Sequence, residues 1–217
     1  KDAALSMKAA NALHLAKRHG DSIHHLQEAA TIFWGRDDSD NAGLAYFKIG
    51  QIQSEEGDLK NAGRSLEQAR RCLETHVLSP FVLYEEAKVM LRDDRHWDVQ
   101  ETTCTALEQC VGKANLRYLT AAFLILRGDA SMSRDPDDEE LLRSAVSDYN
   151  MAVVELRARN KEVGSVVEEH KQEYAVGIMQ EEYGIDHIEQ RLKKAKAAEK
   201  AAKKKKRNKS GSAGFFS

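Results

Sequence analysis

The sequence is poor in residues that interrupt helices. It has two prolines and 13 glycines in 217 residues, and aromatic residues make up 6% of the chain. Proline and glycine weaken helix interiors most, while aromatic and β-branched residues favour strands. Alanine, leucine, glutamate, lysine and arginine, which are strong helix formers, are abundant instead. We therefore expect an all-α protein.

The chain also lacks the features of secreted and membrane proteins. Its three cysteines, Cys72, Cys104 and Cys110, do not suit a disulfide framework, so we expect reduced cysteines that act as small apolar helix residues. No apolar run approaches the roughly 20 residues that span a bilayer, and we find no secretory signal. These absences favour a cytoplasmic, cytoskeletal or nuclear protein. Because the chain begins at Lys1, we expect it to be part of a longer or processed protein.

Local motifs for catalysis are missing. The sequence contains no glycine-rich phosphate loop and no nucleophile elbow. His24 and His25 are adjacent and so point to different helix faces, and we expect no metal site from the remaining histidines. The acidic segment 37–41 lacks the glycine and glutamate of a calcium loop. We expect no catalytic residue, metal, cofactor or small-molecule substrate, and hence a non-enzymatic protein.

An internal repeat is present instead. A small residue is followed four positions later by Leu or Tyr, and three positions after that by another small residue, which places all three on one helical face. The copies begin at intervals of 40, 41 and 42 residues. They are Ser22-Leu26-Ala29, Ala62-Leu66-Ala69, Thr103-Leu107-Cys110 and Ala145-Tyr149-Ala152. Small residues at both ends allow a neighbouring helix to approach closely, and the large residue fills the gap between them.

A second helical face precedes three of these copies and suggests helix pairs. It consists of a large, a small and a long residue at spacings of 4 and 3. The copies are Tyr46-Gly50-Gln53, Leu83-Ala87-Met90 and Tyr118-Ala122-Ile125. Gly57-Asp58 predicts a tight turn within one pair, and Gly128-Asp129 predicts the start of a longer turn in the last pair. We expect eight helices in four antiparallel pairs through about residue 158.

Residues 43–76 resemble a tetratricopeptide repeat (TPR). The matching residues are Tyr46, Ile49, Gly50, Gly57, Asp58, Leu59, Ala62, Leu66 and Ala69. The resemblance extends more loosely over residues 3–158, with repeats longer than the usual 34 residues. It implies a right-handed α-solenoid of about four helix pairs with a concave groove. Because single repeats cannot bury their apolar faces, each would be stabilised by its neighbours.

The resemblance further implies a ligand-binding groove lined by the first helix of each pair. The residues at those positions are Phe47, Lys48, Gln51, Tyr84, Lys88, Arg92, Phe123 and Arg127. This mixture of rings and cations would suit an acidic protein segment with apolar anchors. The alternative is that the rings pack between repeats and the charges form a solvated face. The carboxylate clamp that binds heat-shock chaperones in this family is not matched, because the corresponding positions are Ala9, Leu13, Lys48, Phe81 and Glu85.

The C-terminal part differs from the repeats. We expect four repeats in 1–158, a capping region in 159–190 with a helix at 161–182 and another from about Asp186, and a basic tail in 191–217. The tail holds 11 Lys or Arg residues and one acid, Glu199, whereas the rest of the chain is acidic. Its cations include Lys193, Lys194, Lys196, Lys200, Lys203, Lys204, Lys205, Lys206, Arg207 and Lys209.

Four interpretations of this basic tail remain open. It could be a nuclear-import sequence, dock on an acidic protein surface, such as a cytoskeletal one, contact RNA phosphates, or be a disordered solubilising segment. We expect protein partners in a large assembly, with an RNA-associated adaptor as the alternative. The single-stranded RNA interpretation is disfavoured because residues 184–214 contain no aromatic residue other than histidine to stack on bases.

Overall fold

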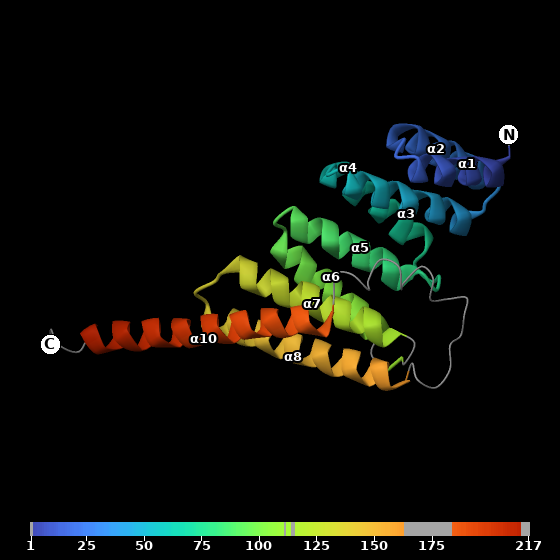
Figure 1. Cartoon of the computed structure of the whole chain (residues 1–217). Helices are drawn as coiled ribbons and strands as arrows, with labels where there is room; N and C mark the ends of the chain where they lie inside the picture. Colours follow the sequence, from blue (N-terminus) through green and yellow to red (C-terminus); the bar gives the residue numbers. More distant parts are fainter. Residues whose placement is uncertain (1, 111, 114–115, 163–183, 214–217) are drawn as a thin grey trace. The chain divides into compact units, whose positions relative to one another are not determined.

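A computed structural model describes residues 2–110, 112–113, 116–162 and 184–213. Within these ranges the chain forms nine α-helices and no strand, which confirms the all-α prediction (Figure 1). The helices are α1 (Ala3–Leu15), α2 (His19–Trp34), α3 (Ser39–Glu55), α4 (Leu59–Cys72), α5 (Ser79–Arg92), α6 (His96–Cys110), α7 (Arg117–Arg134), α8 (Glu139–Glu162) and α10 (Ile185–Ala213). Among the described helices, none has the length and apolar content needed to cross a membrane.

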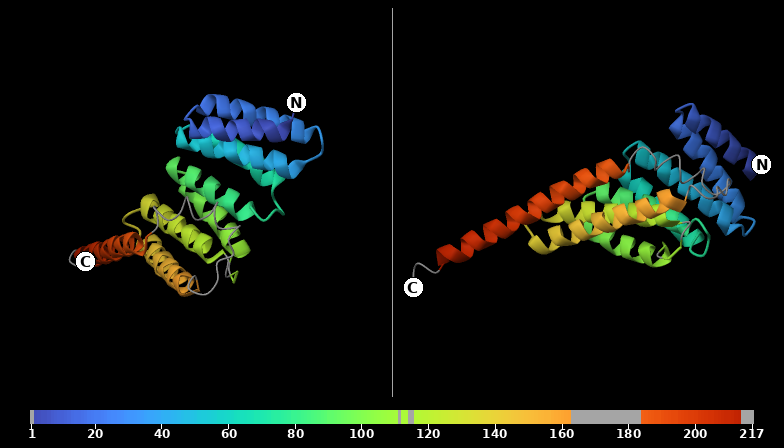
Figure 2. Two further views of the ribbon diagram at one scale, coloured as in Figure 1. Left: turned by 45° about the vertical axis from the view of Figure 1, so that its right-hand side comes forward. Right: turned by 60° about the horizontal axis from the view of Figure 1, so that its bottom comes forward.

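The chain forms two compact units, Lys1–Asp98 and Val99–Ser217. In the first unit, each helix from α1 to α4 packs against the next, and α3 also contacts α5. In the second unit, α7 packs against α8, and α8 packs against α10 (Figures 1 and 2). Helices therefore pack mostly against neighbours in the sequence, an arrangement consistent with a helical repeat.

The turns after α1, α3 and α5 have the same backbone design. In each, the residue two positions beyond the helix end has a positive φ: Lys17 at 58°, Gly57 at 83° and Asp94 at 57°. The next helix begins two residues later. A left-handed residue of this kind ends a helix and reverses the chain direction. The tight turn predicted at Gly57 is present, and the same turn is built twice without glycine.

The starts of α3 and α4 also repeat one another. Asp38 accepts a hydrogen bond from the backbone N–H of Asn41, at 3.2 Å, and Asp58 accepts one from that of Asn61, at 3.3 Å. In both cases the asparagine amide donates to the second carboxylate oxygen at 2.7 Å. Each aspartate thus satisfies an N–H that the first helical turn leaves without a partner.

The small–large–small faces form the core, as predicted. All twelve residues of the four copies are buried. Leu66 lies so close to α3 that a Cβ built at Gly50 would be 2.6 Å from Leu66 Cγ. The polar members are also satisfied: Ser22 Oγ donates to the carbonyl of Ala10 at 2.7 Å. Close helix contact therefore explains why these positions carry small residues.

The turn predicted at Gly128-Asp129 is wrong. Both residues lie inside α7, and the turn to α8 occupies 135–138. A Cβ at Gly128 would lie 2.8 Å from Cε1 of the Tyr149 ring. This glycine is needed because α7 and α8 approach closely around Tyr149, as α3 and α4 do around Leu66.

The cysteines are all free, as expected, but they do not share one environment. Cys110 is buried, and burial raises the pKa of its thiol to about 11. Cys72 is half-buried, whereas Cys104 is exposed. The prediction of a small apolar packing residue therefore fits Cys110 best.

The predicted capping helix at 161–182 lies almost wholly outside the described residues, and 161–162 belong to α8. The helix predicted from about Asp186 is present as α10. It continues across residue 191 to Ala213, so much of the basic segment is helical. Ile188, Ala195 and Ala202 are buried at intervals of seven residues. These three residues, which we call the α10 seam, lie along the helix that packs against α8.

Candidate functional site

The structure separates the predicted groove residues into two groups. The three rings, Phe47, Tyr84 and Phe123, are buried. Phe47 belongs to a core cluster with Leu66 and Val82. Of the polar residues predicted with them, Gln51, Lys48 and Lys88 are half-buried and Arg92 is exposed. A ligand on this surface would therefore meet polar side chains and not the rings, and groove binding itself stays a prediction.

In the first unit, two of the predicted groove cations connect first helices of successive pairs. Lys48 Nζ on α3 donates to Asn11 Oδ1 on α1 at 2.9 Å. Arg92 Nη1 on α5 donates to the carbonyl oxygen of Ser54 on α3 at 2.7 Å, and to Ser54 Oγ at 3.0 Å. The two pairs span 37 and 38 residues. A cation on α3 thus contacts α1, and a cation on α5 contacts α3, each over about one repeat.

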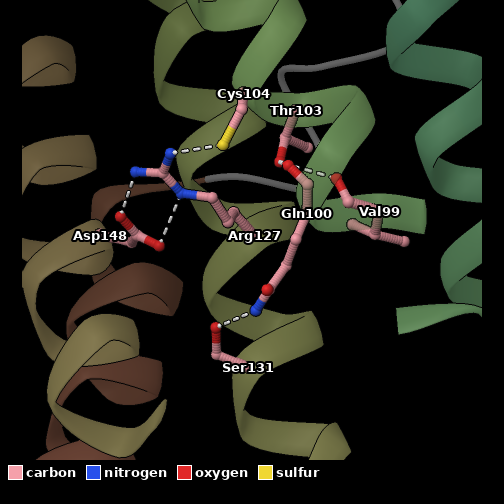
Figure 3. A network of polar contacts seen from close by, with 7 residues as sticks. All are labelled: Val99, Gln100, Thr103, Cys104, Arg127, Ser131 and Asp148. Carbon is pink, nitrogen blue, oxygen red and sulfur yellow. Dashed lines mark hydrogen bonds and ion pairs between the residues drawn. The ribbon is translucent and has the colours of Figure 1, made fainter. Parts of the chain in front are cut away.

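In the second unit, the predicted groove residue Arg127 pairs with a buried acid. Its Nε and Nη2 donate to the two carboxylate oxygens of Asp148 at 3.0 and 2.6 Å (Figure 3). Asp148 is 3% exposed, and its hydrogen bonds raise the pKa of the Arg127 guanidinium. Nη1 also lies 3.6 Å from the Sγ of Cys104. Arg127 therefore joins α7 to α8 and neutralises a buried carboxylate, a partner that sequence reasoning did not identify.

The same network continues from α6 to α7. Gln100 Nε2 donates to Ser131 Oγ at 3.1 Å (Figure 3). Thr103 Oγ1 donates to the carbonyl of Val99 at 2.7 Å. The buried hydroxyl of Thr103 is thus satisfied within its own helix, which allows threonine at a position where other copies have alanine or serine. The hydrogen bonds of this network link α6 to α7 and α7 to α8.

α10 carries a regular row of cations. Lys193, Lys196, Lys200 and Lys203 are exposed and follow one another at spacings of 3, 4 and 3. We call these four residues the lysine stripe. Successive helical residues turn by about 100°, so the stripe lies well away from the α10 seam. The other predicted tail cations with described side chains, Lys194, Lys204, Lys205 and Lys206, are also exposed. The side chains of Arg207 and Lys209 lie outside the described set, although both residues belong to α10.

Ion pairs flank the α10 seam. Arg191 Nη1 lies 3.1 Å from Asp129 Oδ2, and Lys205 Nζ lies 2.6 Å from Asp137 Oδ1. Burial raises the pKa of Asp129, while Arg191 and the hydroxyl of Tyr149, which donates to Asp129 at 2.7 Å, oppose that rise. Part of the basic segment therefore has acidic partners within this chain.

A cleft of about 350 Å³ lies where the end of the α10 seam meets the acidic start of α8. It is lined by Asp137, Asp138, Glu139, Glu140, Ala202, Lys205 and Lys206. Acids on one side and lysines on the other give a cleft of mixed charge. Such a lining favours ionic contact within the chain over binding of an apolar ligand.

A separate group of possible metal ligands occurs at the ends of α1, α2 and α3. One ligand atom each from His14, His19 and Glu55 can be chosen so that all three lie within 4.8 Å of one another. Sequence reasoning missed this group because the residues come from three helices. The signal that could have found it is the repeat register, which places the α1–α2 turn beside the end of α3.

Together these features define an all-helical protein of sequentially packed helices. No model of a known protein family matches the chain, and a search of curated proteins gives no relative. The resemblance to tetratricopeptide repeats therefore depends on the residues of this chain alone.

Proposed function

We propose that this chain is a non-enzymatic scaffold of the tetratricopeptide-repeat type, a right-handed solenoid that binds other proteins within a larger assembly. The observation that carries the proposal is the repetition of contacts. The bridges Asn11–Lys48 and Ser54–Arg92 each connect alternate helices over about one repeat, and the turns at Lys17, Gly57 and Asp94 share one geometry. Repetition of this kind produces an extended surface along the first helices, which is where such scaffolds bind segments of partners.

The lysine stripe provides a second surface, which we propose docks on an acidic protein. The α10 seam holds the helix against α8, so the stripe is presented on a formed helix and not on a flexible tail. Lys205 already pairs with a carboxylate of this chain. Ile185–Ala213 contains no Phe, Tyr or Trp to stack on single-stranded bases. These features favour protein carboxylates over RNA.

Fluorescence anisotropy with the whole chain tests the choice of partner. The probes are a labelled poly-glutamate peptide and a labelled single-stranded RNA of equal length. The stripe variant carries Lys193→Gln, Lys196→Gln and Lys200→Gln. Its control carries Lys8→Gln, Lys60→Gln and Lys113→Gln, which are exposed lysines outside α10 and change the net charge equally.

We expect the stripe variant to bind poly-glutamate more weakly than the control variant, with affinities that fall as salt rises. Sub-micromolar RNA binding at roughly 150 mM salt, with a log–log salt slope of about −0.7 per phosphate contact, would reverse the choice in favour of RNA. Equal loss of peptide binding in both variants would show that net charge and not the stripe is recognised.

A further inference from the structure

We propose that His14, His19 and Glu55 form a binding site for a zinc ion, which fastens the first helix pair to the second. His14 is near the end of α1, His19 begins α2 and Glu55 ends α3. All three lie in the first compact unit. The proposal is independent of the lysine stripe and of the partner that it binds.

The three side chains converge on a small space. The ring centroids of His14 and His19 are 5.3 Å apart. Nε2 of His14 lies 3.8 Å from Oε2 of Glu55, and Nδ1 of His19 lies 3.4 Å from Oε1 of Glu56. Both distances exceed those of ordinary hydrogen bonds, which are about 2.7–3.2 Å. The imidazole nitrogens and the carboxylate oxygens are therefore close to one another, but too far apart for ordinary hydrogen bonds.

The residue types fit zinc. Two imidazoles and one carboxylate are a donor set that zinc accepts with tetrahedral geometry, and water or a second carboxylate completes it. With bonds of about 2 Å, ligand atoms on one zinc ion are about 3.3 Å apart. Side chains must rotate modestly to bring the ligand atoms from their present spacing to that distance. The Glu55 side chain can rotate in this way because it is 56% exposed.

The surroundings of His14 support this assignment. Its Nδ1 is buried and has no hydrogen-bond partner among the described residues. A buried polar nitrogen without a partner is unfavourable. Coordination of the ion through this Nδ1 would give the nitrogen a partner.

Zinc binding by the whole chain is measured by competition with a chromogenic chelator, and cobalt absorption reports on tetrahedral coordination. The variants are His14→Ala, His19→Ala and Glu55→Gln. The matched control is His24→Ala, because His24 is an exposed histidine on α2 outside the group. Far-ultraviolet circular dichroism checks that each variant remains helical.

We expect the wild type and the His24 variant to bind one more equivalent of zinc than either of the other histidine variants. Glu55→Gln should weaken that site by about tenfold or more. Zinc should also slow amide hydrogen exchange in α1 more than in α5, because the ion connects α1 and α2 to α3.

Two results would overturn the site. One is equal zinc affinity in the wild type and the His14 variant, and the other is no binding by the wild type at micromolar zinc. If a histidine variant loses helical structure, Glu55→Gln decides, since full affinity in that exposed substitution contradicts coordination by Glu55.

Discussion

At the scale of single residues, the closest helix contacts depend on paired glycine and large side chains. Gly50 faces Leu66, and Gly128 faces Tyr149, with no room for a Cβ between them. Gly63, by contrast, lies in α4, and a Cβ added there would meet no atom within 4 Å beyond its own helix backbone and chain neighbours. Two glycines in the same unit, Gly50 and Gly63, should therefore respond in opposite ways to the same substitution.

We expect Gly50→Ala to lower the free energy of unfolding by about 1–3 kcal/mol, because the methyl group overpacks against Leu66. Gly63→Ala should raise it by about 0.5–1 kcal/mol, since alanine is the better helix former and meets no obstacle. Urea unfolding of both variants measures the difference. Equal effects of the two substitutions would contradict the close contact at Gly50.

Leu66 itself is completely buried between its small neighbours. Truncation to alanine removes apolar contacts and leaves a cavity next to Gly50, where no side chain can fill it. We expect Leu66→Ala to destabilise the first unit by about 2–5 kcal/mol. A loss well below 1 kcal/mol in urea unfolding would show that the small–large–small face is not the core.

The pair Arg127–Asp148 should be much more sensitive than an exposed ion pair. Arg127→Met leaves the buried Asp148 carboxylate without its partner, which costs about 3–5 kcal/mol. Arg71→Met is the control, since it removes an exposed pair with Glu67 on α4, worth less than about 1 kcal/mol. Adding Asp148→Leu to Arg127→Met should recover part of the loss. If both arginine substitutions have the same effect, the Asp148 pair contributes no more than an exposed one.

At the scale of elements, α10 shows how a lysine-rich sequence can still form a packed helix. Its lysines with described side chains are exposed, while Ile188, Ala195 and Ala202 are buried. Alanines at two of these three positions let α10 approach α8 closely, and the ion pairs Arg191–Asp129 and Lys205–Asp137 lie beside them. The helix is therefore two-sided, with a narrow apolar seam and a cationic outer face.

A pair of alanine substitutions tests this packing. Ala195→Glu places a charge in the seam and should weaken the contact with α8 by at least about 2 kcal/mol. Ala197→Glu makes the same chemical change at an exposed position and should have little effect. Amide hydrogen exchange of α10 reports the contact directly. Equal protection of α10 in the two variants would show that Ala195 does not face α8.

At the scale of the whole molecule, each compact unit contains a partly or largely buried acid with a raised pKa. Burial raises the pKa of Glu86 in the first unit, against an opposing contribution from Arg70, and burial raises the pKa of Asp129 in the second. The folded state then holds these protons at pH values where the unfolded chain has lost them. The free energy of unfolding therefore falls as pH rises from about 4, the ordinary carboxyl pKa, through the raised values.

Neutral substitutions should remove this contribution. Glu86→Gln and Asp129→Asn should gain stability relative to the wild type as pH rises through the same window, and the gain should level off above the folded-state pKa values. Urea unfolding at a series of pH values provides the difference curves. A relative stability that does not change with pH would contradict the raised pKa values.

The residue pattern by itself determined the helical class and the buried faces. The spacing of 4 and 3 residues identified Leu66, Tyr149 and their small neighbours, because helical periodicity is a local property of the chain. The tight turn at Gly57 could also be predicted from the sequence. The equivalent turns at Lys17 and Asp94 could not, since neither residue type requires a positive φ.

Tertiary structure decided which polar residues are available for binding. The sequence predicts Arg127 as a groove cation and Gly128 as a turn residue. In the structure, Arg127 pairs with Asp148 and Gly128 packs against Tyr149. The group of His14, His19 and Glu55 exists only because three helix ends meet. Sequence alone determined the faces that each helix must bury, because these follow from spacing within one helix. Contacts between helices depend on how those faces pack, and so only the folded structure decided which charges are neutralised and which remain exposed.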